Sequence, residues 1–321
     1  MSGKIKIWLV AAASLILCGC IIFGGVMVML KWDFKKLSTV KYETNTHFID
    51  KEFTNISMKT NTADIKFIAS QDGKAKIVCH EEQNAKYSVL VKGGVLTVEL
   101  VNSKKWYEHI GINFGTPKIT VYLPNENYGN LSVKESTGDV EIAKDFKFES
   151  IDVSASTGDV TNLASVTGGI NIKTNTGKIA VKDISAHSLE LSVSTGKVTV
   201  LNAMIEEDVQ VGVSTGKTNI TNAKCKNLTS GGDTGDITLK DVVALEKISM
   251  ERSTGDVEFE RSDAAEISVS TDTGDVSGSL LTDKIFVVST DTGRVEVPKT
   301  TSGGTCEITT DTGDIKFNIV S

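Results

Sequence analysis

The sequence is poor in cysteine, proline and aromatic residues, and each shortage excludes a class of protein. Five cysteines among 321 residues are too few for a disulfide-stapled scaffold. Three prolines beside 28 glycines point to glycine in a structural role rather than in a linker. Aromatic residues make up 6% of the chain, but 40% hydrophobic and 23% charged residues exclude disorder throughout. The formal net charge of −7 argues against nucleic acid as a partner, because phosphate binding depends on clustered Lys and Arg.

One long hydrophobic run lies near the N-terminus, between Lys6 and Lys31. Its 24 uncharged residues form a helix about 36 Å long, enough for a bilayer core of roughly 30 Å. Trp8 and Trp32 lie at the two ends of the run, where amphipathic rings favour the membrane interface. We therefore expect a single-pass transmembrane helix over residues 7–30.

Two other interpretations of this run stay open. A cleaved signal peptide has an apolar core of about 7–15 residues, which is shorter. A lipoprotein signal is the closer rival, because Leu17-Cys18-Gly19-Cys20 resembles a lipobox ending at Cys20. The apolar residues continue to Leu30, which favours an uncleaved anchor. Lysines on both sides leave the topology undecided by charge; we expect a cell-membrane protein with the bulk of the chain extracytoplasmic.

A short motif built on Thr-Gly recurs ten times beyond the anchor, as in Ser156-Thr157-Gly158-Asp159-Val160. Successive central glycines are 19 or 20 residues apart, and a fixed period of this size is typical of a solenoid. The glycines are Gly138, Gly158, Gly177, Gly196, Gly216, Gly235, Gly255, Gly274, Gly293 and Gly313.

The residues around each glycine alternate between apolar and polar. Positions seven and five before the glycine, and two and four after it, are apolar in 36 of 40 cases; the exceptions are Asn162, Thr218, Ser230 and Gly278. Alternation with period two indicates half-buried strands, and a Thr-Gly corner supplies a residue free to take a positive φ. The sequence thus predicts an all-β fold: a single-stranded β-solenoid with coils of about 19–20 residues.

The two ends of the repeat look different. Before it, the residues around Ala63 keep the repeat offsets, and the register is then lost in strands predicted at Lys76–His80, Tyr87–Val91, Val95–Leu100 and Lys118–Leu123. We interpret this part as an irregular β cap. After the repeat, Ile315–Val320 runs nearly to the last residue, which predicts an open edge and self-association through it. The predicted division is a tail (1–6), a transmembrane helix (7–30), a juxtamembrane linker (31–44), a cap (45–130) and a solenoid (131–321).

An N-terminal membrane helix, an irregular β region ending in Leu123-Pro124, and repeated Thr-Gly-Asp coils together resemble the "putative adhesin" family. The resemblance covers roughly residues 45–321. It implies a bacterial β-solenoid domain of unknown function, commonly from Gram-positive envelopes. The family has no catalytic residues that could be assigned here.

Two groups of residues are candidates for binding. Acidic corner residues (Asp233, Asp236, Asp256, Asp272 and Asp275) would form a column that Ca²⁺ could bridge, although Asp is also simply a good turn residue; no other cofactor is expected. Trp106, Tyr107 and His109 form an aromatic cluster in a predicted cap loop, suited either to stacking on a sugar or to a small satellite core.

Two apparent catalytic motifs are coincidences of the repeat. Asp-Thr-Gly at four corners resembles an aspartic protease loop, but Ser-Thr-Gly fills the same slot elsewhere. Gly212–Thr218 resembles a phosphate-binding loop with one residue too few between its glycines. We therefore predict no enzymatic activity and no catalytic residues.

Three functions follow from these observations. The leading one is a non-enzymatic, membrane-anchored envelope protein whose rod presents a binding or adhesion surface to an envelope polymer or a protein partner. The alternative is an accessory or sensing component of an envelope stress-response system. A polysaccharide-active β-helix enzyme is third. Such an enzyme requires an acid/base pair in a groove, whereas the corner carboxylates of this chain are spread along a column with no distinguished site.

Overall fold

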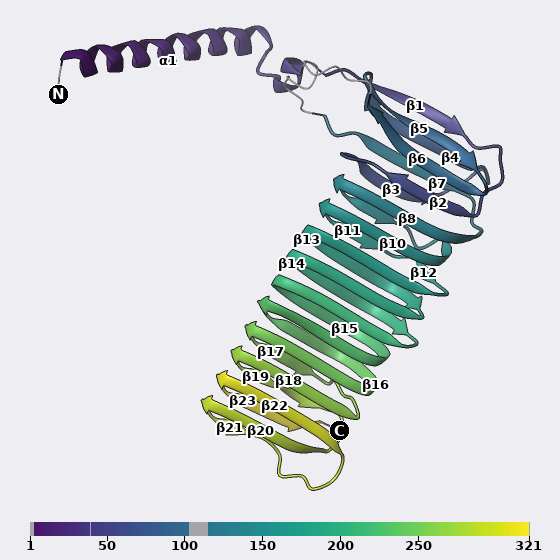
Figure 1. The fold of residues 1–321 in the computed structure, drawn as a ribbon, viewed down its shortest axis with the longest axis vertical. Coiled ribbons are helices and arrows are strands. Elements are labelled where there is room, and N and C mark those ends of the chain that lie inside the picture. The colour runs from purple at the N-terminus through teal and green to yellow at the C-terminus, as the bar shows by residue number, and fades with distance from the viewer. Residues whose placement is uncertain (1–2, 39, 103–114, 321) are drawn as a thin grey trace.

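The computed structural model describes residues 3–38, 40–102 and 115–320, and it shows a long rod with a helix near one end (Figure 1). Helix α1 (Gly3–Met29) is the one helix in these ranges that is long and apolar enough to cross a membrane. An N-terminal signal sequence has the same properties. The short 3-10 helix η1 (Phe34–Leu37) follows, and the rest of the described chain consists of strands and their connections.

The strands nearest the helix form a cap with antiparallel pairing. They are β1 (Tyr42–Phe48), β4 (Lys76–Glu82), β5 (Ala85–Lys92), β6 (Val95–Asn102) and β7 (Lys118–Leu123). Strand β4 lies between β1 and β7, and β5 pairs with β6. Strands β6 and β7 then run parallel to β2 (Asn55–Lys59) and β3 (Asp64–Ala69), which form the first regular coil. The cap therefore passes into the rod within one continuous sheet.

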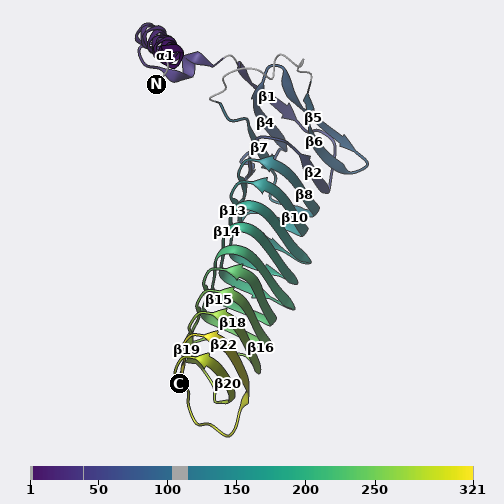
Figure 2. The same ribbon diagram turned by 60° about the vertical axis from the view of Figure 1, so that its left-hand side comes forward.

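The rod is a parallel β-solenoid, as the repeat predicts, and Figure 2 shows its coils stacked in steps away from the cap. Aligned residues of successive coils pair in register, so Gly177 lies opposite Gly196, and Gly196 opposite Gly216. The strands are β8 (Asn127–Thr137), β9 (Val140–Ile142), β10 (Lys147–Thr157), β11 (Val160–Asn162), β12 (Ser165–Val166), β13 (Gly169–Ala186), β14 (Ser188–Ile205), β15 (Asp208–Thr234), β16 (Ile237–Thr254), β17 (Val257–Glu260), β18 (Glu266–Thr273), β19 (Val276–Leu280), β20 (Lys284–Thr292), β21 (Val295–Glu296), β22 (Gly304–Thr312) and β23 (Ile315–Ile319).

Aliphatic ladders fill the interior of the rod. Ile151 stacks between Leu131 and Ile170, and all three side chains are almost fully buried. The three cysteines outside α1, which are Cys79, Cys225 and Cys306, are buried and unpaired. Small and branched side chains in register explain how a chain with so few aromatic residues closes a core.

The corner glycines are required because successive coils approach closely there. Gly216 has a φ of +139°, and a Cβ atom built on it would lie 1.6 Å from the carbonyl oxygen of Gly196. An L residue is strained in that backbone region and collides with the next coil. The predicted positive φ at the corner is confirmed at Gly216 and at most of the other motif glycines.

The last coil is not where the sequence places it. Strand β22 lies between β18 and β20, and β23 lies between β19 and β21. The prediction that Ile315–Val320 forms the open edge is therefore wrong, because the edge strand is β20, one coil earlier in the sequence. The glycine pair Gly303-Gly304 makes this insertion fit: a Cβ on Gly304 would lie 1.9 Å from the Ala265 carbonyl oxygen.

Candidate functional site

A large open cleft lies in the cap, where four connecting segments meet. Its volume is about 1010 Å³. The lining comes from the β1–β2 connection, the β3–β4 connection, the β5–β6 turn and the β7–β8 connection. The lining residues are Phe48, Ile49, Asp50, Lys51, Glu52, Phe53, Thr54, Asp72, Gly73, Lys74, Ala75, Gly94, Pro124, Glu126, Asn127 and Tyr128. Irregular backbone at the end of the rod thus makes this hollow.

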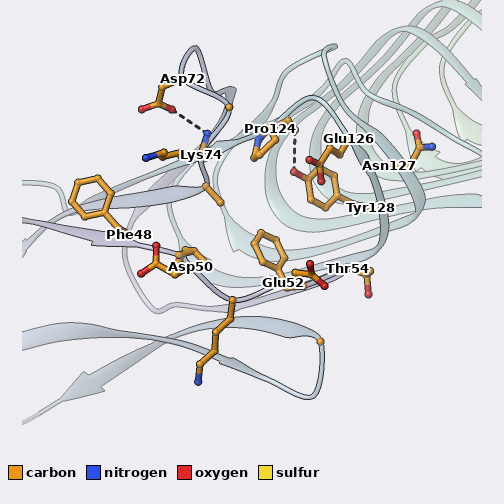
Figure 3. Close-up of a pocket in the computed structure, with 16 residues that line it drawn as sticks. Phe48, Asp50, Glu52, Thr54, Asp72, Lys74, Pro124, Glu126, Asn127 and Tyr128 are labelled. Carbon is orange, nitrogen blue, oxygen red and sulfur yellow. Dashed lines mark hydrogen bonds between the residues drawn. The ribbon is translucent and has the colours of Figure 1, made fainter.

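Aromatic rings line this cleft. Phe48 ends β1 with 68% of its surface exposed, and it lies at the opposite side of the hollow from Tyr128 (Figure 3). Phe53 stacks on Tyr128 with ring centroids 6.0 Å apart, and Tyr128 in turn packs against Phe148 of the rod core. One aromatic face is therefore fixed by the core, while Phe48 is free to be covered by a ligand.

The tyrosine is held in place by a hydrogen bond. Its hydroxyl donates to the Pro124 carbonyl oxygen at 2.9 Å, and burial raises the pKa of Tyr128 above its usual value. The residue Tyr128 is only 6% exposed. The phenol therefore stays neutral and acts as an anchor for the wall of the cleft rather than as an acid or base.

Charged groups surround the rings with an excess of acid: four carboxylates (Asp50, Glu52, Asp72 and Glu126) face two lysines, Lys51 and Lys74. The carboxylate of Asp72 accepts hydrogen bonds from the Ser70 hydroxyl at 2.6 Å and from the Lys74 backbone N–H at 3.2 Å. These bonds lower the pKa of Asp72 to about 2. The cleft thus combines aromatic faces with ionised hydrogen-bond acceptors.

The aromatic cluster predicted as a binding site, Trp106, Tyr107 and His109, lies outside the described residues. The acidic column, in contrast, is well described, and its corner aspartates lie on successive coils. The carboxylates of Asp236, Asp256 and Asp275 each accept a hydrogen bond from the backbone N–H of the corner residue on the next coil, at 3.3, 2.9 and 2.7 Å. Each such bond ties one coil to its neighbour, which explains acid at this slot without a ligand.

The other two aspartates of the proposed calcium site, Asp233 and Asp272, lie exposed two residues before their glycines. Across residues 3–38, 40–102 and 115–320, no group of three or more His, Cys, Asp or Glu side chains is placed to hold a metal ion. Calcium binding at this column stays a prediction, and titration of the full chain with Ca²⁺ tests it.

A buried arginine inside the rod was not anticipated from the sequence. Arg252 is 1% exposed, and its guanidinium donates to the Val213 carbonyl oxygen at 2.6 Å and to the Thr218 hydroxyl at 3.1 Å. It reaches Val213, two coils away, across Gly232, where a Cβ would lie 2.0 Å from the arginine Nη1. The sign of this arginine in the sequence was Thr218, a polar residue at a ladder position that is otherwise apolar.

A buried carboxyl group and a buried ion pair lie near the ends of the rod. Glu135 is 5% exposed on β8, and burial raises its pKa to about 7. Lys284, at the start of β20, forms a buried ion pair with Asp263, with Nζ and a carboxylate oxygen 2.6 Å apart. Lys284 reaches past the inserted β22 to do so, and the pair therefore locks the order of the last coils.

A second row of corners, formed by residues in the left-handed backbone region, was also not predicted from the sequence. Asp183, Asn202 and Asn222 have φ near +50°, and their side chains form a hydrogen-bonded ladder from coil to coil. Asp and Asn six residues after the motif glycine were the signal, since both tolerate the left-handed region.

The comparisons with known proteins agree with this architecture. The family described as Toastrack DUF4097 matches residues 53–229 and 202–321. A solved structure described as a putative adhesin from Parabacteroides merdae is 13% identical, with a TM-score of 0.50, covering 74% of this chain and 96% of that one. A structure described as a putative lipid binding protein from Parabacteroides distasonis is 17% identical, with the same TM-score and coverage. No curated protein matches the chain. The two family matches together span most of the sequence, and the chain belongs to the Toastrack DUF4097 family.

Proposed function

We propose that this chain is a non-enzymatic, membrane-anchored protein of the cell envelope, and that its cap cleft binds a glycan polymer of the envelope. The observation that carries the proposal is the cleft itself, with three aromatic rings and four carboxylates around a hollow of about 1010 Å³. Sugar rings stack their apolar faces on aromatic side chains, while their hydroxyls donate hydrogen bonds to carboxylates.

The anchor and the cleft fit together in this function. Helix α1 has 27 residues and is about 40 Å long, more than the roughly 30 Å of a bilayer core. In Figure 1 the cap is the part of the rod nearest the helix. A cleft on the cap therefore lies close to the membrane, where polymers attached to it or running along it are at high local concentration.

Binding is tested with the full chain in detergent micelles and purified envelope glycans, by co-sedimentation. Phe48→Ala removes an exposed ring from the cleft, and we expect roughly tenfold weaker binding, the equivalent of about 1.4 kcal/mol. The matched control is Leu90→Ala, because Leu90 is similarly exposed at 64% on the cap strand β5 and does not line the cleft. Equal binding by the two variants, or no binding by the unmodified chain, contradicts the glycan proposal.

Location is tested separately on intact cells. We expect an external protease to cleave the rod while a cytoplasmic control protein stays whole. Protection of the rod under conditions that cut a known surface protein contradicts the extracytoplasmic placement.

A further inference from the structure

The end of the rod far from the helix carries an unpaired sheet edge. Strand β20 pairs with β22 on one side, and no strand of the described chain pairs with its other side. Figure 2 shows β20 at the tip, opposite the end where α1 lies. The loop of residues 297–303 contacts the start of the strand, where the Thr300 hydroxyl donates to the Lys284 carbonyl oxygen.

This edge strand is apolar on its outer face, unlike the strands that stack above it. Val287 and Ile285 point outward and are 55% and 43% exposed. The slot of Val287, six residues before the motif glycine, is polar in the nine other coils. The slot of Ile285 is filled on β18 by the charged Glu266, since both residues pair with Thr305 of β22. The tip thus exposes aliphatic side chains at positions where the rest of the rod carries polar ones.

The inward face of the same strand is also incompletely covered. Phe286 and Val288 are only partly buried, whereas Ile267 and Val269, in the same slots on β18, are 0% and 2% exposed. A further strand laid along the edge would complete both faces and pair the free backbone groups.

The usual protection of an edge strand is missing here. Natural edges carry charged side chains, especially lysine, or proline and bulges, but residues 285–290 contain no charge and no proline. The neighbouring Lys284 does not shield the edge, because its ammonium group is buried in the ion pair with Asp263. An uncharged apolar strand favours a partner strand of the same character.

We propose that the partner is a second copy of this chain, and that two rods join tip to tip through antiparallel pairing of their β20 strands. A two-fold axis at Phe286 places Ile285 of each copy opposite Val287 of the other. This register makes two identical aliphatic cross-strand pairs, each a stabilising contact in a sheet. Moving the axis to Val287 instead places Asp283 opposite Asp291, and like charges directly opposite are destabilising.

The geometry gives this contact a direction. Since α1 lies at the other end of each rod, two rods joined at their tips carry their membrane helices at opposite ends. The contact links two membrane surfaces rather than two neighbours in one surface. One tip is small beside a stable dimer interface of about 800 Å² per partner, so a single contact is weak, and many copies on facing membranes reinforce one another.

The experiment uses the full chain reconstituted into lipid vesicles and measures vesicle clustering by light scattering. Vesicles that carry the unmodified chain should cluster with each other. Val287→Lys places a charge on the edge, and we expect at least tenfold less clustering, because the change enters twice at a two-fold contact. The matched control is Ser268→Lys, in the same outward slot on β18; it should cluster like the unmodified chain.

Three outcomes overturn the proposal. Clustering of loaded vesicles with empty ones shows that the tip binds lipid. Equal clustering by the two lysine variants shows that the edge is not the contact. Loss of clustering in Phe48→Ala places the contact at the cap cleft; because the cleft and the tip lie at opposite ends, this proposal and the glycan proposal fail independently.

Discussion

Replacing one corner glycine by alanine measures how closely the coils approach. In Gly216→Ala the new methyl group would lie 1.6 Å from the Gly196 carbonyl oxygen, at a residue whose φ is +139°. The three nearest atoms all belong to the backbone of Gly196, so no flexible side chain can move out of the way. Either the two coils separate at this corner or the chain leaves its left-handed conformation and breaks the turn.

Two costs add at this position. A non-glycine residue in this part of φ/ψ space costs about 1–3 kcal/mol. Forcing an extra methyl group into packed structure costs about 1–3 kcal/mol more. We therefore expect Gly216→Ala to lower the free energy of unfolding by about 2–6 kcal/mol, a large share of the roughly 5–15 kcal/mol of a typical domain.

Urea unfolding of the full chain in detergent, followed by circular dichroism of the strands, measures this loss. The control is Gly212→Ala on the same strand β15, where the nearest atom to a new Cβ is the Ser192 hydroxyl oxygen at 3.7 Å and φ is outside the left-handed region. Alanine there reduces the entropy of the unfolded chain and should be neutral or stabilising by up to about 1 kcal/mol. Equal effects of the two substitutions would refute the account of the corner.

Three further predictions concern buried polar groups. Since burial raises the pKa of Glu135 from 4.5 to about 7, the folded chain holds a proton that the unfolded chain releases, and stability falls as pH rises through this window. Glu135→Gln should remove this pH dependence, which amounts to about 3 kcal/mol of the free energy of unfolding at pH 8. Urea unfolding at pH 5 and at pH 8 measures it. Lys284→Met leaves the buried Asp263 carboxylate without its lysine and should lower the free energy of unfolding by about 3–5 kcal/mol. Lys247→Met, at an exposed ion pair, should lower it by under about 1 kcal/mol in the same assay. Arg252→Met should cost about 1–3 kcal/mol, and adding Thr218→Val should recover part of the loss, as a thermal melt can show.

The repeat was predictable because one residue type in one slot performs the same task in every coil. Val133, Val153 and Ile172 each face the interior at the same offset, and each is almost fully buried. Gly196 and Gly216 likewise sit at corners that no other residue can form at this separation. Repetition multiplies a weak local pattern into a clear one, which is why the fold class follows from the sequence.

The polar node inside the rod was not predictable in the same way. The ladder exceptions Thr218 and Ser230 were visible as single breaks in the pattern. The cause at Thr218 is a side chain from another coil: Arg252 donates to the Thr218 hydroxyl and extends over Gly232 to a carbonyl oxygen 39 residues away. A contact between side chains at different positions of the repeat does not recur in every coil, so it produces no periodic pattern in the sequence.

The order of the last coils left no trace either. The glycines at Gly274, Gly293 and Gly313 keep the regular spacing, yet β22 enters between β18 and β20. The exchange depends on the close passage of Gly304 and on the long reach of Lys284. The repeat period gives the number of residues per coil but does not say which coil stacks on which.

The cleft could not be predicted from the sequence because its walls come from four unlike connections.

The regularity of the rod limits where it can act. Between the two ends, each coil pairs on both sides with its neighbours, so the backbone offers a ligand little, and the outward slots are mostly small polar residues or exposed ion pairs. Such pairs are worth little individually and are screened by salt. At the ends this pairing is interrupted: the cap leaves a hollow at Tyr128, and the tip leaves a free edge at Val287. A specific contact needs apolar area and unpaired groups together, and both candidate contacts lie at an end of the rod. The coils between them then act as a spacer of about 4.8 Å per turn, and their number sets how far the tip stands from the cap.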